Sequence, residues 1–221
     1  MQSRAKERGV VSKLSKPSFT FEKRARSNGF SLIAGLDEAG RGPLAGPVVA
    51  AACVLPLCKP FKGLADSKRL TSKEREACFK KLVSHSSVHY GIGIVEADQI
   101  DRINILQATL LAMLRALEQL SVLPDYLLID GIHAPKTELP FETVIEGDAR
   151  SYSIAAASIL AKVTRDRQMI AYHALYPRYG FDRHKGYATA KHLEAIQKWG
   201  ACPLHRKSFD PIRELAQLKF L

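Results

Sequence analysis

The chain has 221 residues, 46% of them hydrophobic, which suits one globular domain with an ordinary core. Lys and Arg number 33 against 22 Asp and Glu, so the formal net charge is +11 and an anionic partner is expected, nucleic acid before an acidic membrane. No apolar run approaches the ~20 residues that span a bilayer, no secretion signal is visible, and the four cysteines form no CxxC pair. We therefore expect a cytoplasmic protein without a membrane partner.

The first 30 residues differ from the rest in charge. They hold eight Lys and Arg and two Glu, which supplies +6 of the total, and they show no apolar periodicity. This composition predicts a basic, flexible arm over residues 1–30, followed by one domain over residues 31–221. The arm either attracts phosphates or only keeps the chain soluble, and the sequence does not choose between these roles.

Beyond the arm, apolar strand patterns alternate with helical spacing. Thr71 and Glu74 have the spacing of a capping box, which predicts the start of a helix. The expected order is strands at 32–37 and 48–55, a helix at 71–83, a strand at 88–96, a helix at 103–120, strands at 126–130 and 143–145, a helix from 150, a loop at 176–186, and helices at 188–199 and 213–219. This order indicates an α/β domain with helices on both faces of the sheet and a helical C-terminal extension from about residue 176.

Acidic residues end three of the apolar strands. The stretches LIAGLDE, YLLIDG and TVIEGD place Asp37 with Glu38, Asp130 and Asp148 at strand ends. Ligands of open α/β sheets gather at the carboxyl ends of strands, so these carboxylates are expected to converge. One such Asp would more often be a turn residue. Three such ends with a basic surface favour a site for Mg²⁺ or Mn²⁺, because all the ligands are oxygens and because cations would relieve the repulsion between carboxylates.

Two neighbouring acids cannot both point into one site from a regular strand, since consecutive side chains face opposite sides. Either Glu38 lies past the end of the strand, or its main-chain carbonyl is the ligand. Both alternatives are open at this point.

Several basic and aromatic residues are candidates for holding the substrate. Each cation alone is more often a solvated surface charge, and a tyrosine is often a half-buried core residue with a paired hydroxyl. A ring that stacks on a sugar or base is the functional alternative for Tyr187. The candidate phosphate ligands are Lys68, Lys162, Arg165 and Lys185.

The stretch GLDEAGRGPLAGPVVAAA, which begins at Gly35, resembles the signature of the prokaryotic type 2 ribonucleases H, ribonuclease HII in particular. Matching stretches follow along most of the chain: DSKRL, INILQAT, LLIDG, EGDARSYSIAAASILAKVTRD and HKGY. The resemblance implies the ribonuclease H-like fold with a mixed central sheet. It also implies that the four acids form the metal site, and that the ribose is read by Gly40, Arg41, Gly42 and Tyr187.

The implied activity is cleavage of the RNA strand of RNA–DNA hybrids, and incision on the 5′ side of single ribonucleotides in duplex DNA, by a monomer with two divalent cations. Three alternatives are open: a ribonuclease HIII-like enzyme, another nuclease or recombinase of the same fold, and a non-catalytic RNA-binding module. Asp148 as the fourth acid argues against the first, and the three acidic strand ends argue against the last. A sliding clamp as a partner is compatible with the resemblance but does not follow from the residues.

Overall fold

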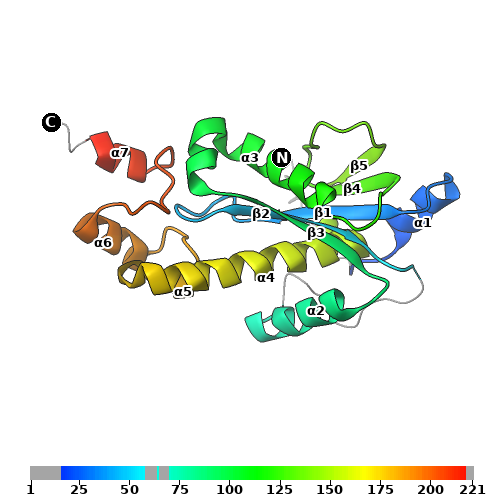
Figure 1. The fold of residues 1–221 in the computed structure, drawn as a ribbon, viewed down its shortest axis with the longest axis horizontal. Coiled ribbons are helices and arrows are strands. Elements are labelled where there is room, and N and C mark those ends of the chain that lie inside the picture. Colours follow the sequence, from blue (N-terminus) through cyan, green and yellow to red (C-terminus); the bar gives the residue numbers. More distant parts are fainter. Residues whose placement is uncertain (1–15, 58–63, 65–69, 218–221) are drawn as a thin grey trace, which may run out of the picture.

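The computed structural model describes residues 16–57, 64 and 70–217 (Figure 1). Lys68 and residues 1–15 lie outside this part of the chain. Among the described residues, no helix is both long enough and apolar enough to cross a membrane.

A mixed sheet of five strands forms the centre of the molecule, in the order β3-β2-β1-β4-β5. The first strand pairs antiparallel with the second and parallel with the fourth, which in turn pairs parallel with the fifth. The mixed central sheet expected from the sequence is confirmed. The strands are β1 (Ile33–Ala39), β2 (Val48–Val54), β3 (His89–Val95), β4 (Tyr126–Asp130) and β5 (Phe141–Val144).

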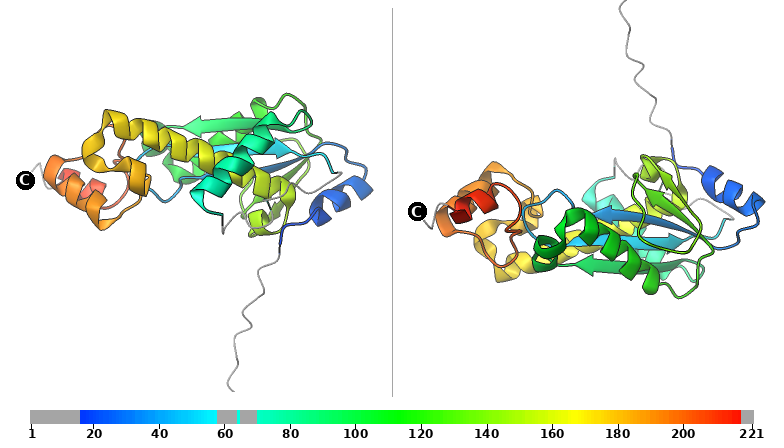
Figure 2. Two further views of the ribbon diagram at one scale, coloured as in Figure 1. Left: turned by 90° about the horizontal axis from the view of Figure 1, so that it is seen from below. Right: turned by 90° about the horizontal axis from the view of Figure 1, so that it is seen from above.

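Helices cover both faces of the sheet, and further helices extend from one end of it (Figures 1 and 2). The third helix packs on β2 and β3, whereas the fourth packs on the opposite face against β1 and β2, with the second helix beside it. The helices are α1 (Thr20–Ser27), α2 (Ser72–Ser84), α3 (Ala97–Glu118), α4 (Tyr152–Leu175), α5 (Phe181–His184), α6 (Ala190–Trp199) and α7 (Ile212–Gln217), with short 3₁₀ turns η2 (Gly147–Ala149) and η3 (Pro177–Tyr179).

Small residues let α4 lie close against the central strand. A Cβ added to Gly35 in β1 would stand 2.2 Å from the main-chain carbon of Ser153, so only glycine fits there. The capping box of Thr71 and Glu74 is present as predicted at the start of α2. The apolar helix expected at 103–120 is part of a longer element, α3, which Asn104 interrupts with a φ of 65° and a ψ of 165°.

The prediction of a flexible arm over residues 1–30 is wrong for its second half. Helix α1 packs on the domain, and the carboxylate of Glu22 is fully buried. One oxygen of Glu22 accepts hydrogen bonds from the Ser151 hydroxyl at 2.7 Å and from the main-chain N–H of Ser153 at 2.9 Å, at the start of α4. Charge composition could not predict the burial of Glu22, because the groups that stabilise its carboxylate lie far away in the sequence. The role of residues 1–15 stays a prediction.

The C-terminal helical region has its own core, at the end of the molecule opposite α1 (Figure 2). Three histidines lie in and beside it. His192 and His205 are buried, with 3.1 Å between their Nε2 atoms, and the ring of His184 stacks on that of His192 at 4.3 Å. Burial lowers the pKa of both His192 and His205 to about 4.

These histidines make the C-terminal region sensitive to acid. Above pH 6.5 they are neutral in the folded and the unfolded chain, but between pH 6.5 and about 4 only the unfolded chain binds the protons. The free energy of unfolding should therefore fall on acidification, by up to about 1.4 kcal/mol per pH unit for each histidine. Thermal melting from pH 7.5 to 4.5 measures this. His192→Gln should flatten the dependence relative to the parent; the parental slope in His192→Gln would refute the assignment.

Candidate active site

The acidic strand ends meet at one edge of the sheet. Leu36 and Ile129 are partners in the parallel pairing of β1 and β4, so the residues that follow them, Asp37 and Asp130, lie side by side where the pairing ends. Beyond β5 the chain turns into η2, which carries Asp148. The backbone geometry therefore brings Asp37 and Asp130 together, whereas convergence of the Asp148 carboxylate with them stays a prediction.

A glycine fixes the position of the last acid. The main-chain N–H of Gly147 donates to Oδ1 of Asp130 at 2.6 Å. A Cβ at this position would lie 3.1 Å from that oxygen and 2.5 Å from Cδ1 of Ile154, so a side chain would push η2 away. Glu146, directly before it, adopts the left-handed conformation with a φ of 54°. Together these features hold the start of η2, the turn that carries Asp148, against Asp130.

The carboxylates at this edge destabilise one another's charged forms. Burial raises the pKa of Asp37 well above its usual value, and the charges of Asp130 and Glu38 raise it further. Hydrogen bonds from the Ser158 hydroxyl and from the main-chain N–H of Glu38 oppose this only in part. The pKa of Glu38 is also raised by burial. A divalent cation would remove this repulsion.

Glu38 lies inside β1, so the alternative that placed it past the strand end is wrong. Its side chain lines a cleft of about 170 Å³, together with Asp130 and residues of α3, while Asp37 is buried against Ser158 of α4. One oxygen, Oε1, lies 3.2 Å from Nη1 of Arg41, and the other, Oε2, is buried without a hydrogen-bond partner. The alternative of a main-chain carbonyl ligand stays a prediction.

These residues fit hard divalent cations. All the donors are oxygens, and the orphaned Oε2 of Glu38 lacks the partner that a buried carboxylate oxygen requires. Within the described residues, no group of three or more His, Cys, Asp or Glu side chains is arranged to hold a metal ion. The assignment of the four acids to the cations therefore stays a prediction.

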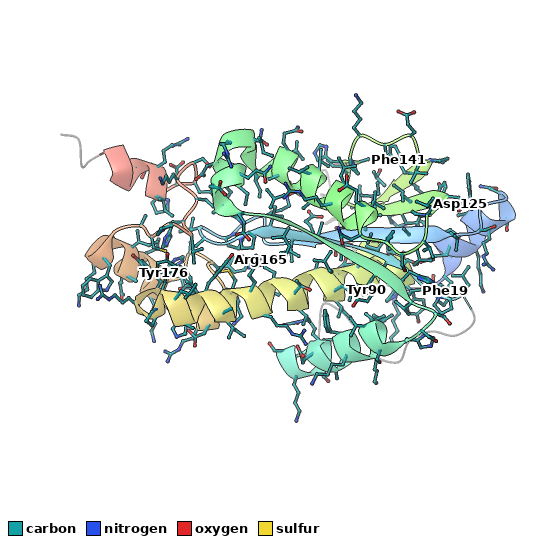
Figure 3. All side chains as sticks on the ribbon, viewed as in Figure 1. Phe19, Tyr90, Asp125, Phe141, Arg165 and Tyr176 are labelled. Carbon is teal, nitrogen blue, oxygen red and sulfur yellow. The ribbon has the colours of Figure 1, made fainter. Side chains whose placement is uncertain are left out.

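Two buried arginines donate hydrogen bonds to main-chain carbonyls of the loop between β1 and β2. Arg165, on α4, donates to the carbonyls of Pro47, Lys185 and Ala45 at 2.9, 3.0 and 3.1 Å (Figure 3). It is fully buried, so its prediction as a phosphate ligand is wrong. Sequence spacing placed it correctly among the basic residues of α4 but could not show that its guanidinium points inward.

Arg206 is the second of these arginines, and sequence reasoning missed it. It is also fully buried, and it donates to the carbonyls of Gly46, Arg41 and Gly40 at 3.0, 2.8 and 2.6 Å. Burial, and then the charge of Arg165, lower its pKa to about 9, so it stays charged at neutral pH. The only signal in the sequence was the stretch CPLHRKSF, where one more cation in a basic chain looks like a solvated charge.

Tyr187 stands at the same loop, although it lies far away in the sequence. Its side chain is 46% exposed, so it is not a core tyrosine. A Cβ added to Gly42 would lie 3.8 Å from Cε1 of the Tyr187 ring. The structure therefore brings an exposed aromatic ring together with the glycine-flanked loop that follows the first two acids.

The predicted phosphate ligands other than Arg165 have different surroundings. The ammonium of Lys162 pairs with Asp166 one turn further along α4, at 2.8 Å. The ammonium of Lys185 bonds to the main-chain carbonyl of Asp182. Roles in phosphate binding for Lys162, Lys185 and Lys68 stay predictions.

Comparison with known proteins gives one consistent family. The family model of ribonuclease HII matches residues 34–212. A curated ribonuclease HII from Chlamydia abortus is 56% identical over 195 residues, which cover 88% of this chain and 92% of the relative. Among solved structures, the ribonuclease H2 from Pyrococcus horikoshii OT3 superposes with a TM-score of 0.70 at 28% identity, covering 85% of this chain and 98% of that one.

Two further solved structures share the fold at lower identity. Bst-RNase HIII in complex with Mn²⁺ gives a TM-score of 0.67 at 21% identity, covering 89% of this chain and 73% of that one. The PCNA:RNase HII complex from Archaeoglobus fulgidus gives 0.65 at 22%, covering 81% of this chain and 96% of that one.

Proposed function

The chain belongs to the ribonuclease HII family, and we propose that it incises duplex DNA on the 5′ side of a single ribonucleotide, using two divalent cations and leaving a 3′-hydroxyl. Family membership itself makes it a metal-dependent ribonuclease that hydrolyses the RNA strand of RNA–DNA hybrids. The observation that carries the finer proposal is the meeting of acidic strand ends, a glycine-flanked loop and an exposed tyrosine at one edge of the sheet.

We propose that Asp37, Glu38, Asp130 and Asp148 hold the cations, which are Mg²⁺ or Mn²⁺. Two such ions, if bound there, would lower the pKa of the attacking water and stabilise the leaving oxygen. The protein contributes the placement of these carboxylates by β1, β4 and η2, and the buried surroundings that keep Asp37 in position.

We propose that the loop between β1 and β2 and the ring of Tyr187 recognise the ribose. A nuclease that acts at one ribonucleotide cannot rely on A-form shape along the whole duplex, and must sense a single 2′-hydroxyl. Gly42 is exposed and leaves the main chain open to a close approach, whereas Gly40 is buried against Arg165. Arg206 donates to the carbonyls of Gly40 and Arg41 and so fixes the loop. We propose that Tyr187 stacks on the next sugar and favours a deoxyribose there, so that it reads the RNA-to-DNA junction.

The test is cleavage of two substrates side by side: a DNA duplex with one ribonucleotide and an all-RNA/DNA hybrid, each with Mn²⁺ or with EDTA. We expect cuts in both with metal, a single cut 5′ of the lone ribonucleotide, and none with EDTA. Binding without cleavage under every metal condition would favour the RNA-binding module. Cleavage of the hybrid alone would favour a ribonuclease HIII-like specificity.

Replacing Tyr187 should separate the two substrates. Tyr187→Ala should lower kcat/KM at an isolated ribonucleotide roughly ten- to a hundredfold, and should affect long hybrid less, because loss of one aromatic stacking contact costs about 1–3 kcal/mol. Tyr187→Phe should be milder if stacking matters more than the hydroxyl. Tyr90→Ala, at a partly exposed tyrosine on β3, is the control. An equal loss on both substrates would remove the junction-reading role.

We propose a monomer as the active form, and a sliding clamp as the first partner protein to test. The structural neighbour from Archaeoglobus fulgidus was solved as a PCNA:RNase HII complex. Co-elution of this chain with the clamp of its own replication system is the measurement.

A further inference from the structure

The C-terminal helical region carries a second cleft, which shares no lining residue with the cleft beside the acids. Its volume is about 710 Å³, against about 170 Å³ beside Glu38 and Asp130. It lies between the end of α4, η3 and α5 on one side and the start of α6 on the other. Nothing in the metal site or the ribose-reading loop accounts for it.

The charge of this cleft is positive and is not compensated within the cleft. Arg178 in η3, Arg183 in α5 and Lys191 in α6 line it, and all three side chains are exposed. The one acid in the lining, Asp182, lies 3.2 Å from Nδ1 of His173. In the described part of the chain no carboxylate forms an ion pair with any of the three cations, so the lining carries 3 − 1 = +2 formal charges with its histidines neutral. A concave surface of one charge sign concentrates counter-ions of the other.

An exposed aromatic ring borders the cleft. The guanidinium of Arg178 lies over the ring of Trp199 at 4.7 Å from its centroid, and the ammonium of Lys198 lies at 4.9 Å from the same centroid. The side chain of Trp199 is 48% exposed, although tryptophan is usually well buried. Cations spread over three elements suit a sugar–phosphate chain better than a small anion, which would need donors that converge on one point.

The cleft and the proposed junction reader form one unit of the backbone. The main-chain N–H of Tyr187 donates to the carbonyl of His184 at 3.0 Å, and its own carbonyl accepts from the N–H of Thr189 at 2.8 Å. Both His184 and Thr189 line the cleft. Tyr187 and the cleft therefore adjoin one another on the molecule.

We propose that this basic cleft binds phosphodiester groups of the duplex that flanks the cut. The inference rests on the proposed function for the identity of the duplex. It adds a separate binding surface, which supplies affinity but no chemistry. Each phosphate contact contributes about 0.9 to the slope of log K against log salt.

The test is binding of a long ribonucleotide-containing duplex in EDTA, measured by fluorescence anisotropy at several salt concentrations. The variant Arg183→Gln/Lys191→Gln should raise Kd roughly tenfold at about 0.1 M salt, and should lower the slope by about one to two units. The control Lys23→Gln/Lys81→Gln removes two exposed lysines on α1 and α2 and should stay within about twofold of the parent. Melting curves of both double variants check that they are folded.

Two outcomes would overturn the proposal. One is equal binding and equal salt slope for the cleft variant and its control. The other is competition by a few millimolar inorganic phosphate that abolishes the difference between parent and cleft variant, which would make the cleft a site for free anions. Cleavage by the unsubstituted protein with Mn²⁺ is scored separately, so a protein that binds through the cleft but does not cut would refute the proposed function alone.

Discussion

Asp130→Asn should lower cleavage of both substrates by about a thousandfold or more, while binding of the hybrid stays within a fewfold of the parent. The carboxylate of Asp130 lies beside Asp37 at the edge of the sheet, and a metal-bound transition state loses several kcal/mol when an anionic ligand is replaced by a neutral one. Binding should persist because contacts between Lys or Arg and phosphate dominate affinity. Single-turnover cleavage with Mn²⁺ and anisotropy in EDTA measure the two quantities.

The same substitution should stabilise the protein when no metal is present. The charge of Asp130 contributes to the raised pKa of Asp37, so removing it favours the folded protein with Asp37 ionised. A carboxyl group whose pKa is raised in the folded protein lowers the free energy of unfolding when the pH is high enough to ionise it. The gain in melting temperature should therefore appear at neutral pH and vanish in acid. Asp125→Asn is the matched control for the loss of one carboxylate charge, because Asp125 lies at the other end of β4, away from Asp37 (Figure 3). The carboxylate of Asp125 accepts a hydrogen bond from the main-chain N–H of Leu32 at 2.9 Å. Near-parental cleavage by Asp130→Asn would contradict the metal assignment.

Arg206→Met should destabilise the protein by about 3 kcal/mol and impair cleavage at a single ribonucleotide more than cleavage of hybrid. Three carbonyls of the loop between β1 and β2 lose their donor, and an unpaired buried carbonyl costs about 1–3 kcal/mol, partly offset by relief of the repulsion from Arg165. For a domain of this size we expect a fall in melting temperature of roughly 6–12 °C. Substrate discrimination should weaken because the loop that approaches the ribose is no longer fixed.

Arg206→Lys tests whether the shape of the guanidinium or its charge matters. A lysine keeps the charge but cannot span three carbonyls, so it should recover little stability. Arg26→Met, at an exposed arginine of α1, should change the free energy of unfolding by less than about 0.5 kcal/mol. Melting within a degree of the parent and unchanged discrimination in Arg206→Met would show that the loop holds its shape without this anchor.

The sequence was most informative where function depends on local pattern. The capping box at Thr71 is a short-range signal, and the structure places it as expected. The apolar stretch that ends in Asp130 is also a strand that ends at this residue, whereas β1 continues past Asp37 to Ala39. The convergence of Asp37 and Asp130 also followed from the sequence, because parallel strands align their carboxyl ends.

The failures came from contacts between distant residues. Glu22 is buried by Ser151 and Ser153, and the arginines at 165 and 206 are buried by carbonyls of a loop more than a hundred residues away. Charge composition predicts exposure in all three cases, since a single sequence does not show where compensating donors and acceptors lie. For the same reason the sequence suggested Tyr187 for the ribose but could not show its ring beside Gly42.

The central claim is that the four carboxylates hold two divalent cations at a duplex that carries one ribonucleotide. The most direct measurement counts Mn²⁺ bound to the complex with a duplex that keeps its one ribonucleotide but carries a non-hydrolysable phosphonate at the scissile bond, by titration followed with electron paramagnetic resonance, in the parent and in Asp130→Asn. We predict two ions per complex in the parent, fewer in the variant, and little binding to the variant without duplex. Equal numbers of bound ions in the parent and the variant would contradict the account.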